Sequence, residues 1–531
     1  MTDSAMTQPV LINGEWRASV GTRSFRAHNP KTREATPDSY PVSPWPEIDE
    51  AMRASARAFE QLRWVSPDQI AEFLDKFADL FEERRSRISE LAELETALAR
   101  EPRLNSVELP RTTGQLRQAA AAARDRSWSM PTIDTENNVR TMFSAIGPIV
   151  VFGPNNFPMA FGSASGGDFA AAIAAGNPVI AKANSSHPGT TRLLAEAAND
   201  AAAATAMPAA MVQLLYRTDH DDGKKLVSHP LIGATGYTGS RSAGLALKEA
   251  ADKAGKLIYL ELSSINPVVI LPGAIRERAD DLANEFITSV FMGTGQFCTN
   301  PGVVLLLEHE TTAPFVSDVQ SRFNEAPVGT LLSEGVEQSM TASIGALKSA
   351  GATVVTGGSS GGGEGYSFNN TLLQVTAATF LADPETLQCE AFGNASLFVI
   401  ADDTAQLQDV INSLEGNLTG CVYSDTGGSD DAVYDEIAPL LRARVGRLLN
   451  DKMPTGVLVS PAMNHGGPYP ATAHAGFTAV GIPASLRRFA ALQCYDAVRP
   501  NRLPPELQDT NPTASLWRLI DSQWTRNHVG A

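Results

Sequence analysis

The chain has 531 residues, of which 43% are apolar, and a formal net charge of −17 at pH 7. This length is too great for one hydrophobic core, so we expect two or three domains. The acidic balance and the lack of a Lys/Arg run argue against a nucleic-acid partner, because phosphate recognition needs a clustered basic surface.

The start of the chain, residues 1–9, is polar and lacks the layout of a secretory signal. No window approaches the roughly 18 consecutive apolar residues of a membrane span. The cysteines, Cys298, Cys389, Cys421 and Cys494, form neither a disulfide framework nor a metal-ligand spacing. We therefore expect a cytoplasmic protein with reduced thiols, no metal site and no membrane partner.

The first elements in chain order are a hairpin and two helical regions. Residues 11–16 place Asn-Gly between two short apolar runs, which predicts a β-hairpin. Residues 70–98 carry apolar side chains at three- and four-residue steps, which indicates a helical packing stripe. Residues 112–126 predict another helix, near whose start lie Arg111 and Arg117.

From residue 146 the chain alternates between apolar strands and helices. Strands this apolar indicate a parallel sheet covered on both faces, as in a doubly wound nucleotide-type domain. The predicted strands cover residues 149–152, 178–181, 212–216, 232–234 and 257–260, and the helices cover 166–175, 189–204, 223–228 and 242–253.

A second alternating region starts near residues 267–270. It continues with a helix over 279–292 and a strand over 303–307, just after Cys298. Residues 351–365 are rich in glycine and predict an exposed loop. The segment from Pro500 is polar and rich in proline, so we expect it to lie outside the core.

Two features of the first region suggest an anion-binding site. Residues 236–244 carry glycines at three points where a strand is expected to lead into a helix, and such a turn lets backbone amides approach a pyrophosphate. The spacing differs from the G-x-G-x-x-G fingerprint, and a tight connection is the alternative. Lys182 ends a strand and precedes polar residues, which favours a ribose or phosphate contact over a plain surface lysine.

Three residues could carry chemistry. Cys298 lies among small, polar and turn-forming residues (295–302), which suits a nucleophile. Glu261 directly follows an apolar strand, where lost hydration favours a general base, although pairing with a lysine is the alternative. Asn156 lies just beyond another strand end and can donate to an oxyanion or merely cap a turn.

A cysteine hydrolase would pair Cys298 with a histidine, and His465 and His474 are available. Nothing in the sequence around them indicates such a pair, and a hydrolase has no use for a dinucleotide-type sheet. Cys421 and Cys494 lie in apolar neighbourhoods and are expected to be core residues.

Taken together, the motifs resemble the aldehyde dehydrogenase superfamily from the hairpin to the region of Cys494. Several separate motifs occur in the family's order, which makes the resemblance specific. They are Asn156-Phe157-Pro158, Lys182, Thr238-Gly239-Ser240, Glu261-Leu262, Gly295-Gln296-Phe297-Cys298, Glu390-Ala391-Phe392-Gly393 and Pro454-Thr455-Gly456.

The resemblance implies an α/β fold of two doubly wound domains with a small β oligomerisation element. The dinucleotide-binding domain would comprise residues 1–130 and 146–265, and the catalytic domain residues 266–483. Residues 131–145 and 484–500 would form the oligomerisation element, and 501–531 a C-terminal tail. A homodimer or homotetramer is implied.

The resemblance also implies a role for each site residue. Cys298 would attack the aldehyde, Asn156 and the Cys298 backbone N–H would hold the oxyanion, and Glu261 would activate the water that hydrolyses the thioester. The implied cofactor contacts are Lys182 with the adenine-side ribose, Gly239 and Ser240 with the pyrophosphate, Glu390 with the nicotinamide ribose and Phe392 with the nicotinamide end.

Within the superfamily the chain is most similar to NADP-linked 2,5-dioxovalerate (α-ketoglutarate semialdehyde) dehydrogenases and their fatty-aldehyde relatives. The residues behind this are 111–117, 185–190, 261–267 and 465–472. A glutamate commonly replaces Ser185 in NAD-preferring relatives, so the resemblance favours NADP, with NAD as the alternative. Candidate helpers for the 2′-phosphate are Arg217, His220 and Arg241.

The segment after residue 472 departs from these relatives, which usually have an Asp and an Arg there. This chain instead reads Ala473-His474-Ala475-Gly476-Phe477. The departure leaves a medium- or long-chain aliphatic aldehyde as the alternative substrate, with Arg111 and Arg117 as candidate carboxylate clamps. A non-catalytic binding protein is the alternative from another class, but such a chain has no reason to keep Cys298, Glu261 and Asn156.

Overall fold

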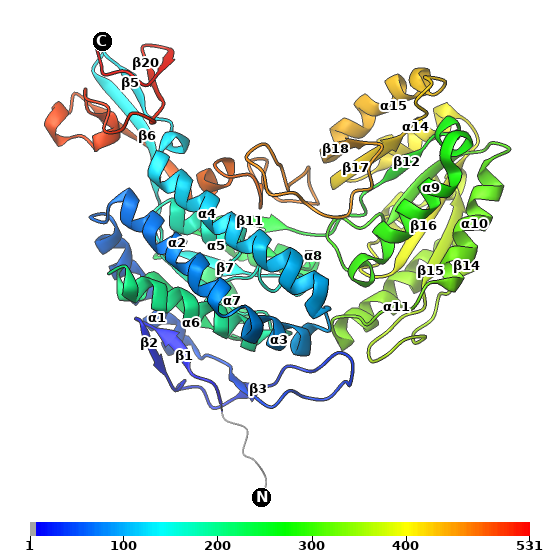
Figure 1. Ribbon diagram of the computed structural model, residues 1–531, viewed down its shortest axis with the longest axis horizontal. Helices are drawn as coiled ribbons and strands as arrows, with labels where there is room; N and C mark the ends of the chain where they lie inside the picture. The colour runs from blue at the N-terminus through cyan, green and yellow to red at the C-terminus, as the bar shows by residue number, and fades with distance from the viewer. Residues whose placement is uncertain (1–6, 531) are drawn as a thin grey trace, which may run out of the picture.

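A computed structural model of the chain describes residues 7–530, so the start of the polar N-terminal stretch lies outside the described residues. Two seven-stranded sheets form the centres of two α/β units, and a five-stranded sheet projects beyond the first unit (Figure 1). Within residues 7–530 no helix combines the length and the apolar character needed to cross a bilayer.

The first sheet confirms the predicted parallel arrangement and the N-terminal hairpin. Strands β11, β10, β7, β8 and β9 are parallel, and the hairpin β1–β2 adds to β9 in antiparallel fashion with Leu11 opposite Trp16. The strands are β1 (Val10–Ile12), β2 (Glu15–Arg17), β7 (Ile149–Phe152), β8 (Val179–Lys182), β9 (Val212–Leu215), β10 (Ala234–Thr238) and β11 (Leu257–Glu261).

One strand boundary was predicted wrongly. The strand expected at residues 232–234 begins instead at Ala234, and Gly236 and Tyr237 lie inside β10. A Cβ atom on Gly236 would lie 2.4 Å from the Asp168 carboxylate, so this glycine serves packing between β10 and a helix. Only the later part of the glycine-containing stretch is therefore a turn.

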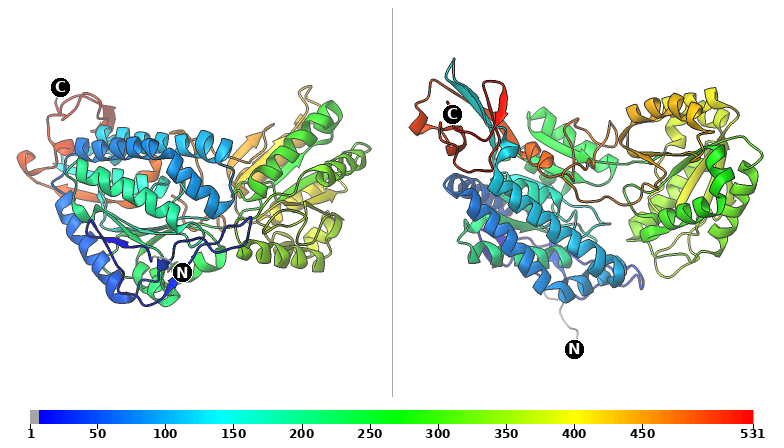
Figure 2. Two further views of the ribbon diagram at one scale, coloured as in Figure 1. Left: turned by 60° about the horizontal axis from the view of Figure 1, so that its bottom comes forward. Right: turned by 45° about the horizontal axis from the view of Figure 1, so that its top comes forward.

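Helices cover the first sheet on both faces (Figure 2). The predicted stripe over residues 70–98 is divided between two helices, and its rings Phe73, Phe77 and Phe81 are fully buried. The helices are α1 (Trp45–Leu62), α2 (Pro67–Glu83), α3 (Arg85–Thr96), α4 (Leu109–Asp125), α5 (Gly167–Ala174), α6 (Pro188–Ala204), α7 (His220–Val227) and α8 (Arg241–Lys253).

The second sheet has the order β14-β15-β16-β13-β12-β17-β18 and is parallel except for the edge strand β14. That edge lies in the glycine-rich stretch predicted as a loop. The strands are β12 (Val268–Ile270), β13 (Val303–Leu307), β14 (Thr353–Thr356), β15 (Thr371–Thr376), β16 (Ala395–Ala401), β17 (Asn417–Tyr423) and β18 (Val445–Asn450). The helices are α9 (Pro272–Phe291), α10 (Thr312–Glu325), α11 (Glu334–Ser349), α12 (Ala377–Ala382), α13 (Pro384–Leu387), α14 (Thr404–Ser413) and α15 (Asp431–Arg444).

The third sheet corrects two expectations. The segment after Pro500 is not outside the core, because β20 (Arg518–Ile520) pairs with β5 (Thr132–Asp134) and β21 (Gln523–Thr525) extends the sheet. Arg518 is fully buried, since its guanidinium donates to backbone carbonyls of the same segment. The sheet is completed by β6 (Val139–Ala145) and by β19 (Ala490–Asp496) at its edge, where Cys494 is exposed rather than buried as expected.

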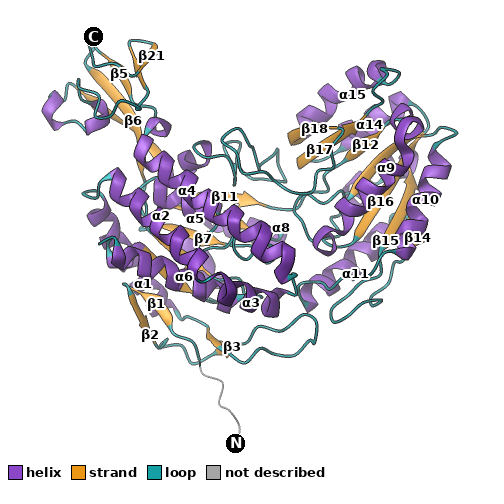
Figure 3. Cartoon of the chain, in the orientation of Figure 1, coloured by secondary structure: helices purple, strands orange, loops and turns teal. Residues whose placement is uncertain are grey.

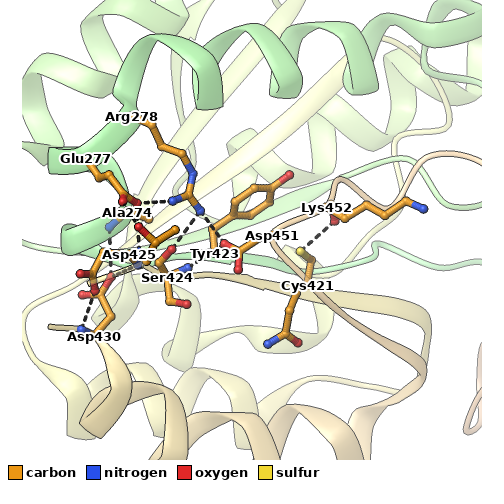
Figure 4. Close-up of polar contacts among 12 residues, drawn as sticks. Ala274, Glu277, Arg278, Cys421, Tyr423, Ser424, Asp425, Asp430, Asp451 and Lys452 are labelled. Carbon is orange, nitrogen blue, oxygen red and sulfur yellow. Dashed lines mark hydrogen bonds and ion pairs between the residues drawn. The ribbon is translucent and has the colours of Figure 1, made fainter. Parts of the chain in front are cut away.

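A polar cluster ties β17 to the start of α9 (Figure 4). The buried Asp430 carboxylate accepts from the backbone N–H groups of Gly273, Ala274 and Asp425 at 3.0, 3.0 and 2.9 Å. Helix N-terminal N–H groups have no partner within the helix, so this carboxylate supplies one. Nearby, the Cys421 thiol is buried and donates to the Lys452 carbonyl at 2.9 Å, as expected of a core cysteine.

Replacing Asp430 by alanine is expected to destabilise the fold by about 2 to 4 kcal/mol, because it leaves buried N–H groups without an acceptor. The exposed neighbour Asp431 gives a matched control, and Asp431→Ala should change stability by less than about 0.5 kcal/mol. Urea unfolding followed by tryptophan fluorescence measures both. Equal midpoints for the two variants would contradict the capping role.

Candidate active site

The loop that carries Cys298 is shaped by glycine. Gly293, Thr294 and Gly295, just before it, have φ of 57°, 58° and 71°, values in the left-handed region. A Cβ on Gly295 would lie 2.0 Å from the Gly393 carbonyl oxygen, so only glycine allows the loop to contact the Glu390–Gly393 stretch this closely. The loop therefore places Cys298, a residue of intermediate exposure, shortly before β13.

A buried asparagine that the sequence reading did not single out fixes this loop. Asn266 Nδ2 donates to the carbonyls of Cys298 and Asn300, each at 2.9 Å. Asn417 Oδ1 in turn accepts from the Asn266 backbone N–H at 3.1 Å. The carbonyls on both sides of Thr299 are thus held by one side chain, which fixes the direction of the thiol.

His465 lies between Cys298 and Glu261. Its Nε2 is 3.4 Å from Cys298 Sγ and 2.9 Å from Glu261 Oε1, and the three atoms lie within 4.8 Å of one another. Glu261 and His465 are buried, with exposed fractions of 1% and 2%. His465 is therefore a neighbour of Cys298 that nothing in the sequence around it indicates.

The position of His465 follows from strand-like pairing with β11. Residues 451–483 form a long segment without helix or strand that returns from the second unit toward the first (Figures 1 and 2). Glu261 and Thr472 form an isolated antiparallel bridge, and Leu262 N–H donates to the Ala471 carbonyl at 2.8 Å. His474 lies elsewhere, with its ring 4.8 Å from that of Tyr259.

Burial raises the pKa of the Cys298 thiol well above its ordinary value, and the charges of Glu261 and Glu390 add to this, while Arg111 opposes it. The thiol is therefore the resting form at neutral pH. Since the thiolate is the nucleophilic form, chemistry at this sulfur requires a neighbour that accepts its proton. His465 and Glu261 are both placed to do so.

Asn156 reaches the same loop from the end of β7. Its Nδ2 donates to the Gln296 carbonyl at 2.9 Å, which leaves its second N–H free. The Asn156 backbone carbonyl accepts from Arg103 Nη2 at 3.1 Å, and Arg103 pairs with the buried Glu108 at 2.5 Å. Glu108 also accepts from the N–H groups of Met159 and Ala160, so an ion pair not foreseen from the sequence holds this segment.

Lys182 is the last residue of β8. Among residues 7–530, no acidic side chain lies within ion-pair distance of it. Burial and the nearby Arg217 charge lower its pKa to about 8. Ser185 lies three residues further on and is half-buried, and Arg217 is exposed beside β9. The Lys182 and Arg217 charges are thus near enough to act on each other, and an anion bound close to them would relieve this repulsion.

The turn at residues 239–240 leads into α8. Ser240 is the N-cap residue but its side chain caps no N–H group, so the first-turn N–H groups remain free for an anion. Arg241 instead pairs with Glu415 of the second unit at 2.7 Å, which removes it from the helpers considered for a 2′-phosphate. The remaining candidate His220 is exposed at the start of α7.

Glu390 and Phe392 line a pocket together with Phe297 and Asn300 of the Cys298 loop. Burial raises the pKa of Glu390 to about 7, although hydrogen bonds from Ser264 and Ser263 oppose the shift. Lys182 and Glu261 end β8 and β11, whereas Asn156, Cys298, Glu390 and Phe392 lie outside the helices and strands; loops and turns are drawn in teal in Figure 3.

Comparisons with known proteins agree on a family. Residues 16–444 match the model described as "Aldehyde dehydrogenase family". Alpha-ketoglutaric semialdehyde dehydrogenase 2 of Azospirillum brasilense is 37% identical over 98% of this chain and 99% of its own length. Alpha-ketoglutaric semialdehyde dehydrogenase of Acinetobacter baylyi is 34% identical over 97% and 98%.

Solved structures show the same fold at lower identity. An NAD+ complex of aldehyde dehydrogenase from Bacillus cereus superposes with a TM-score of 0.79 at 21% identity, covering 93% of this chain and 97% of the other. A complex of PnpE with nicotinamide adenine dinucleotide gives 0.80 at 19% identity and covers 93% and 99%. The two-domain α/β fold is thereby confirmed.

Proposed function

The chain belongs to the aldehyde dehydrogenase family, and we propose that it oxidises α-ketoglutarate semialdehyde to 2-oxoglutarate with NADP. The single observation that carries the chemistry is the group of Cys298, His465 and Glu261, whose reactive atoms lie within 4.8 Å of one another beside the Asn156 amide. The substrate is that of two relatives aligned over almost their whole length.

The first step is proton transfer from the Cys298 thiol to His465, 3.4 Å away, because the raised thiol pKa keeps the sulfur protonated at rest. Glu261 stabilises the resulting imidazolium through its contact at 2.9 Å. The thiolate then attacks the aldehyde carbon.

The negative oxygen formed by this attack is bound by Asn156. The free N–H of its side chain donates without changing charge, and the Cys298 backbone N–H is the second donor. The ion pair of Arg103 with Glu108 holds the Asn156 backbone in place, so both act as positioning residues.

The chemistry that NADP would supply when bound is acceptance of a hydride, and loss of that hydride from the tetrahedral carbon would leave a thioester on Cys298. Glu261, with His465 in contact, then takes a proton from the water that attacks the thioester carbonyl. By this point the imidazolium has given the first proton to solvent. Collapse of the adduct breaks the carbon–sulfur bond and releases the carboxylic acid, and the proton held by Glu261 passes to the Cys298 sulfur. Once it has lost the first proton, the imidazole is available again in the second half-reaction, because the same Nε2 faces sulfur and carboxylate.

The residues present suit a dinucleotide. Lys182 has no anionic partner in the described chain, and the first turn of α8 offers N–H groups with no side-chain cap. Lys182 would hold the adenine-side ribose, Gly239 and Ser240 the pyrophosphate, and Glu390 the nicotinamide ribose. Phe392 would pack beside the nicotinamide, on the pocket that also reaches the Cys298 loop.

The preference for NADP rests on Ser185 and the cations beside it. A neutral hydroxyl can donate to a 2′-phosphate, and Lys182 and Arg217 add positive charge. NAD is the alternative cofactor, as in the complexes of the structural relatives.

Replacing Ser185 by glutamate should weaken NADP binding by about 10- to 100-fold, because a carboxylate repels the phosphate, and should change NAD binding much less. Quenching of protein fluorescence by each cofactor gives the dissociation constants. Ser186→Glu adds the same charge one residue away and is the control. If the two variants bind NADP and NAD with the same dissociation constants, Ser185 has no special part in the preference for NADP over NAD.

A panel of aldehydes tests the proposed function. Purified protein is assayed with α-ketoglutarate semialdehyde, hexanal and dodecanal, each with NADP and with NAD, by absorbance of the reduced cofactor. We expect the highest kcat/KM for the semialdehyde with NADP. Faster oxidation of the aliphatic aldehydes would favour the alternative substrate class, and no oxidation at all would favour a non-catalytic protein.

The assembly and location of the protein are part of the proposal. The dinucleotide-binding domain would comprise residues 1–130 and 146–265, and the catalytic domain residues 266–483. We propose that the third sheet, including residues 518–525, is the oligomerisation element of a homodimer or homotetramer, since its edge strand β19 exposes unpaired backbone groups. A cytoplasmic location is consistent with the reduced cysteines the chemistry requires.

A further inference from the structure

Arg111 carries a buried charge without a counter-ion. It lies in the first turn of α4, and its Nε donates to the Val457 carbonyl at 3.4 Å. Its Nη1 and Nη2 are buried and have no acceptor in the part of the chain that the structure describes. A buried guanidinium left this way is costly, which points to an anion that these nitrogens bind.

The position of Arg111 is beside the reacting residues. Its guanidinium lies over the Phe161 ring at 4.8 Å, and the Phe161 ring lies 5.5 Å from the ring of His465. Burial lowers the pKa of Arg111, as does the nearby Arg103 charge, whereas the carboxylates of Glu108 and Glu261 raise it. Neither carboxylate is free to neutralise Arg111, since Glu108 already pairs with Arg103 and Glu261 contacts His465.

A second arginine adds to the positive potential. Arg447 donates to the carbonyls of Pro454 and Gly456 and contacts Met463 Sδ, so within residues 7–530 its nitrogens have only neutral acceptors. Its charge also acts on Cys298. Arg117, the other candidate clamp on α4, is different because it is exposed and pairs with Asp79 at 2.7 Å and with Asp75.

We propose that Arg111 binds the carboxylate at the far end of the substrate and so selects short ω-oxo acids over neutral aldehydes. The planar fork of Nη1 and Nη2 suits two parallel hydrogen bonds to a carboxylate. The inference rests on the proposed oxidation at Cys298 and adds the substrate specificity of that reaction.

The test compares an acid with a neutral aldehyde of equal carbon number. Arg111→Met should lower kcat/KM for α-ketoglutarate semialdehyde by about 100-fold, mainly through KM, and change kcat/KM for pentanal by less than about threefold. Arg111→Lys should recover part of the loss, because it restores charge without the fork. Arg117→Met, on the exposed face of the same helix, should match the wild type with both aldehydes.

An equal loss of kcat/KM for both aldehydes would mean that Arg111 has a structural role. No loss for either aldehyde would mean that Arg111 does not bind the substrate. Either result overturns the proposal. A binding measurement separates this from failure of the proposed oxidation. Glutarate, an unreactive five-carbon diacid, is titrated calorimetrically into Cys298→Ser protein with and without Arg111→Met. We expect at least about tenfold weaker binding in the double variant. Equal binding, or no binding to either, would overturn the inference even if aldehyde turnover were absent.

Discussion

Replacing Cys298 by serine should lower aldehyde-dependent formation of reduced cofactor by at least about 10³-fold. A serine hydroxyl is far less acidic than a thiol, so neither His465 nor Glu261 can remove its proton at neutral pH. The dissociation constant for NADP should stay within a few-fold of the wild type, because Cys298 belongs to the Gly295 loop rather than to the β8 and α8 ends of the site.

Cys494→Ser is the control for this variant. That cysteine is exposed on β19 in the third sheet, so its loss should leave turnover unchanged. Absorbance of the reduced cofactor gives the rates and fluorescence quenching gives the affinity. Substantial turnover by the Cys298→Ser protein would show that another group attacks the aldehyde.

Replacing His465 by glutamine should lower kcat by about 10² to 10⁴-fold, the range typical of a general base. Glutamine keeps a hydrogen-bonding group between Cys298 and Glu261 but cannot accept the proton. The pH profile gives a second readout. Because the thiol pKa is raised, the thiolate fraction is small at neutral pH and grows as pH rises, so the variant's rate should climb more steeply toward alkaline pH than the wild-type rate.

His474→Gln is matched in chemistry and lies nine residues away on the same segment, against the Tyr259 ring. It should leave kcat and the pH profile near those of the wild type. Rates measured across the pH range for both variants show whether the His465 imidazole acts as the base. If His465→Gln kept wild-type kcat and an unchanged profile, the imidazole would be a bystander.

The parts of the fold that sequence predicts well are those set by local patterns. Alternation of apolar and polar residues and the Asn13-Gly14 turn gave the hairpin, and apolar runs gave the parallel strands. Gly236 misled because a glycine reads locally as a turn, whereas here it makes room for the Asp168 carboxylate from another element. The segment after Pro500 misled for a related reason, since the burial of Arg518 within it depends on backbone carbonyls that no composition reveals.

The site was predictable only in part. Cys298, Glu261 and Asn156 could be found because each follows a strand or occupies a recognisable motif. His465 could not be paired with them by spacing, since 204 residues separate it from Glu261 and only the bridge between Glu261 and Thr472 brings it there. Its motif, residues 465–472, was the one available signal. Arg111 and Arg117 likewise look equivalent in the sequence. The structure separates them, because Arg117 forms an ion pair with Asp79.

Cys298 carries the acyl group during oxidation, and trapping that acyl group tests its role most directly. Wild-type protein is mixed with NADP and α-ketoglutarate semialdehyde, quenched in acid within milliseconds, digested and examined by mass spectrometry. The mechanism predicts a thioester on the peptide that contains Cys298 and none in protein mixed with semialdehyde alone. An acyl group on another residue, or turnover with Cys298 unmodified at every quench time, would contradict it.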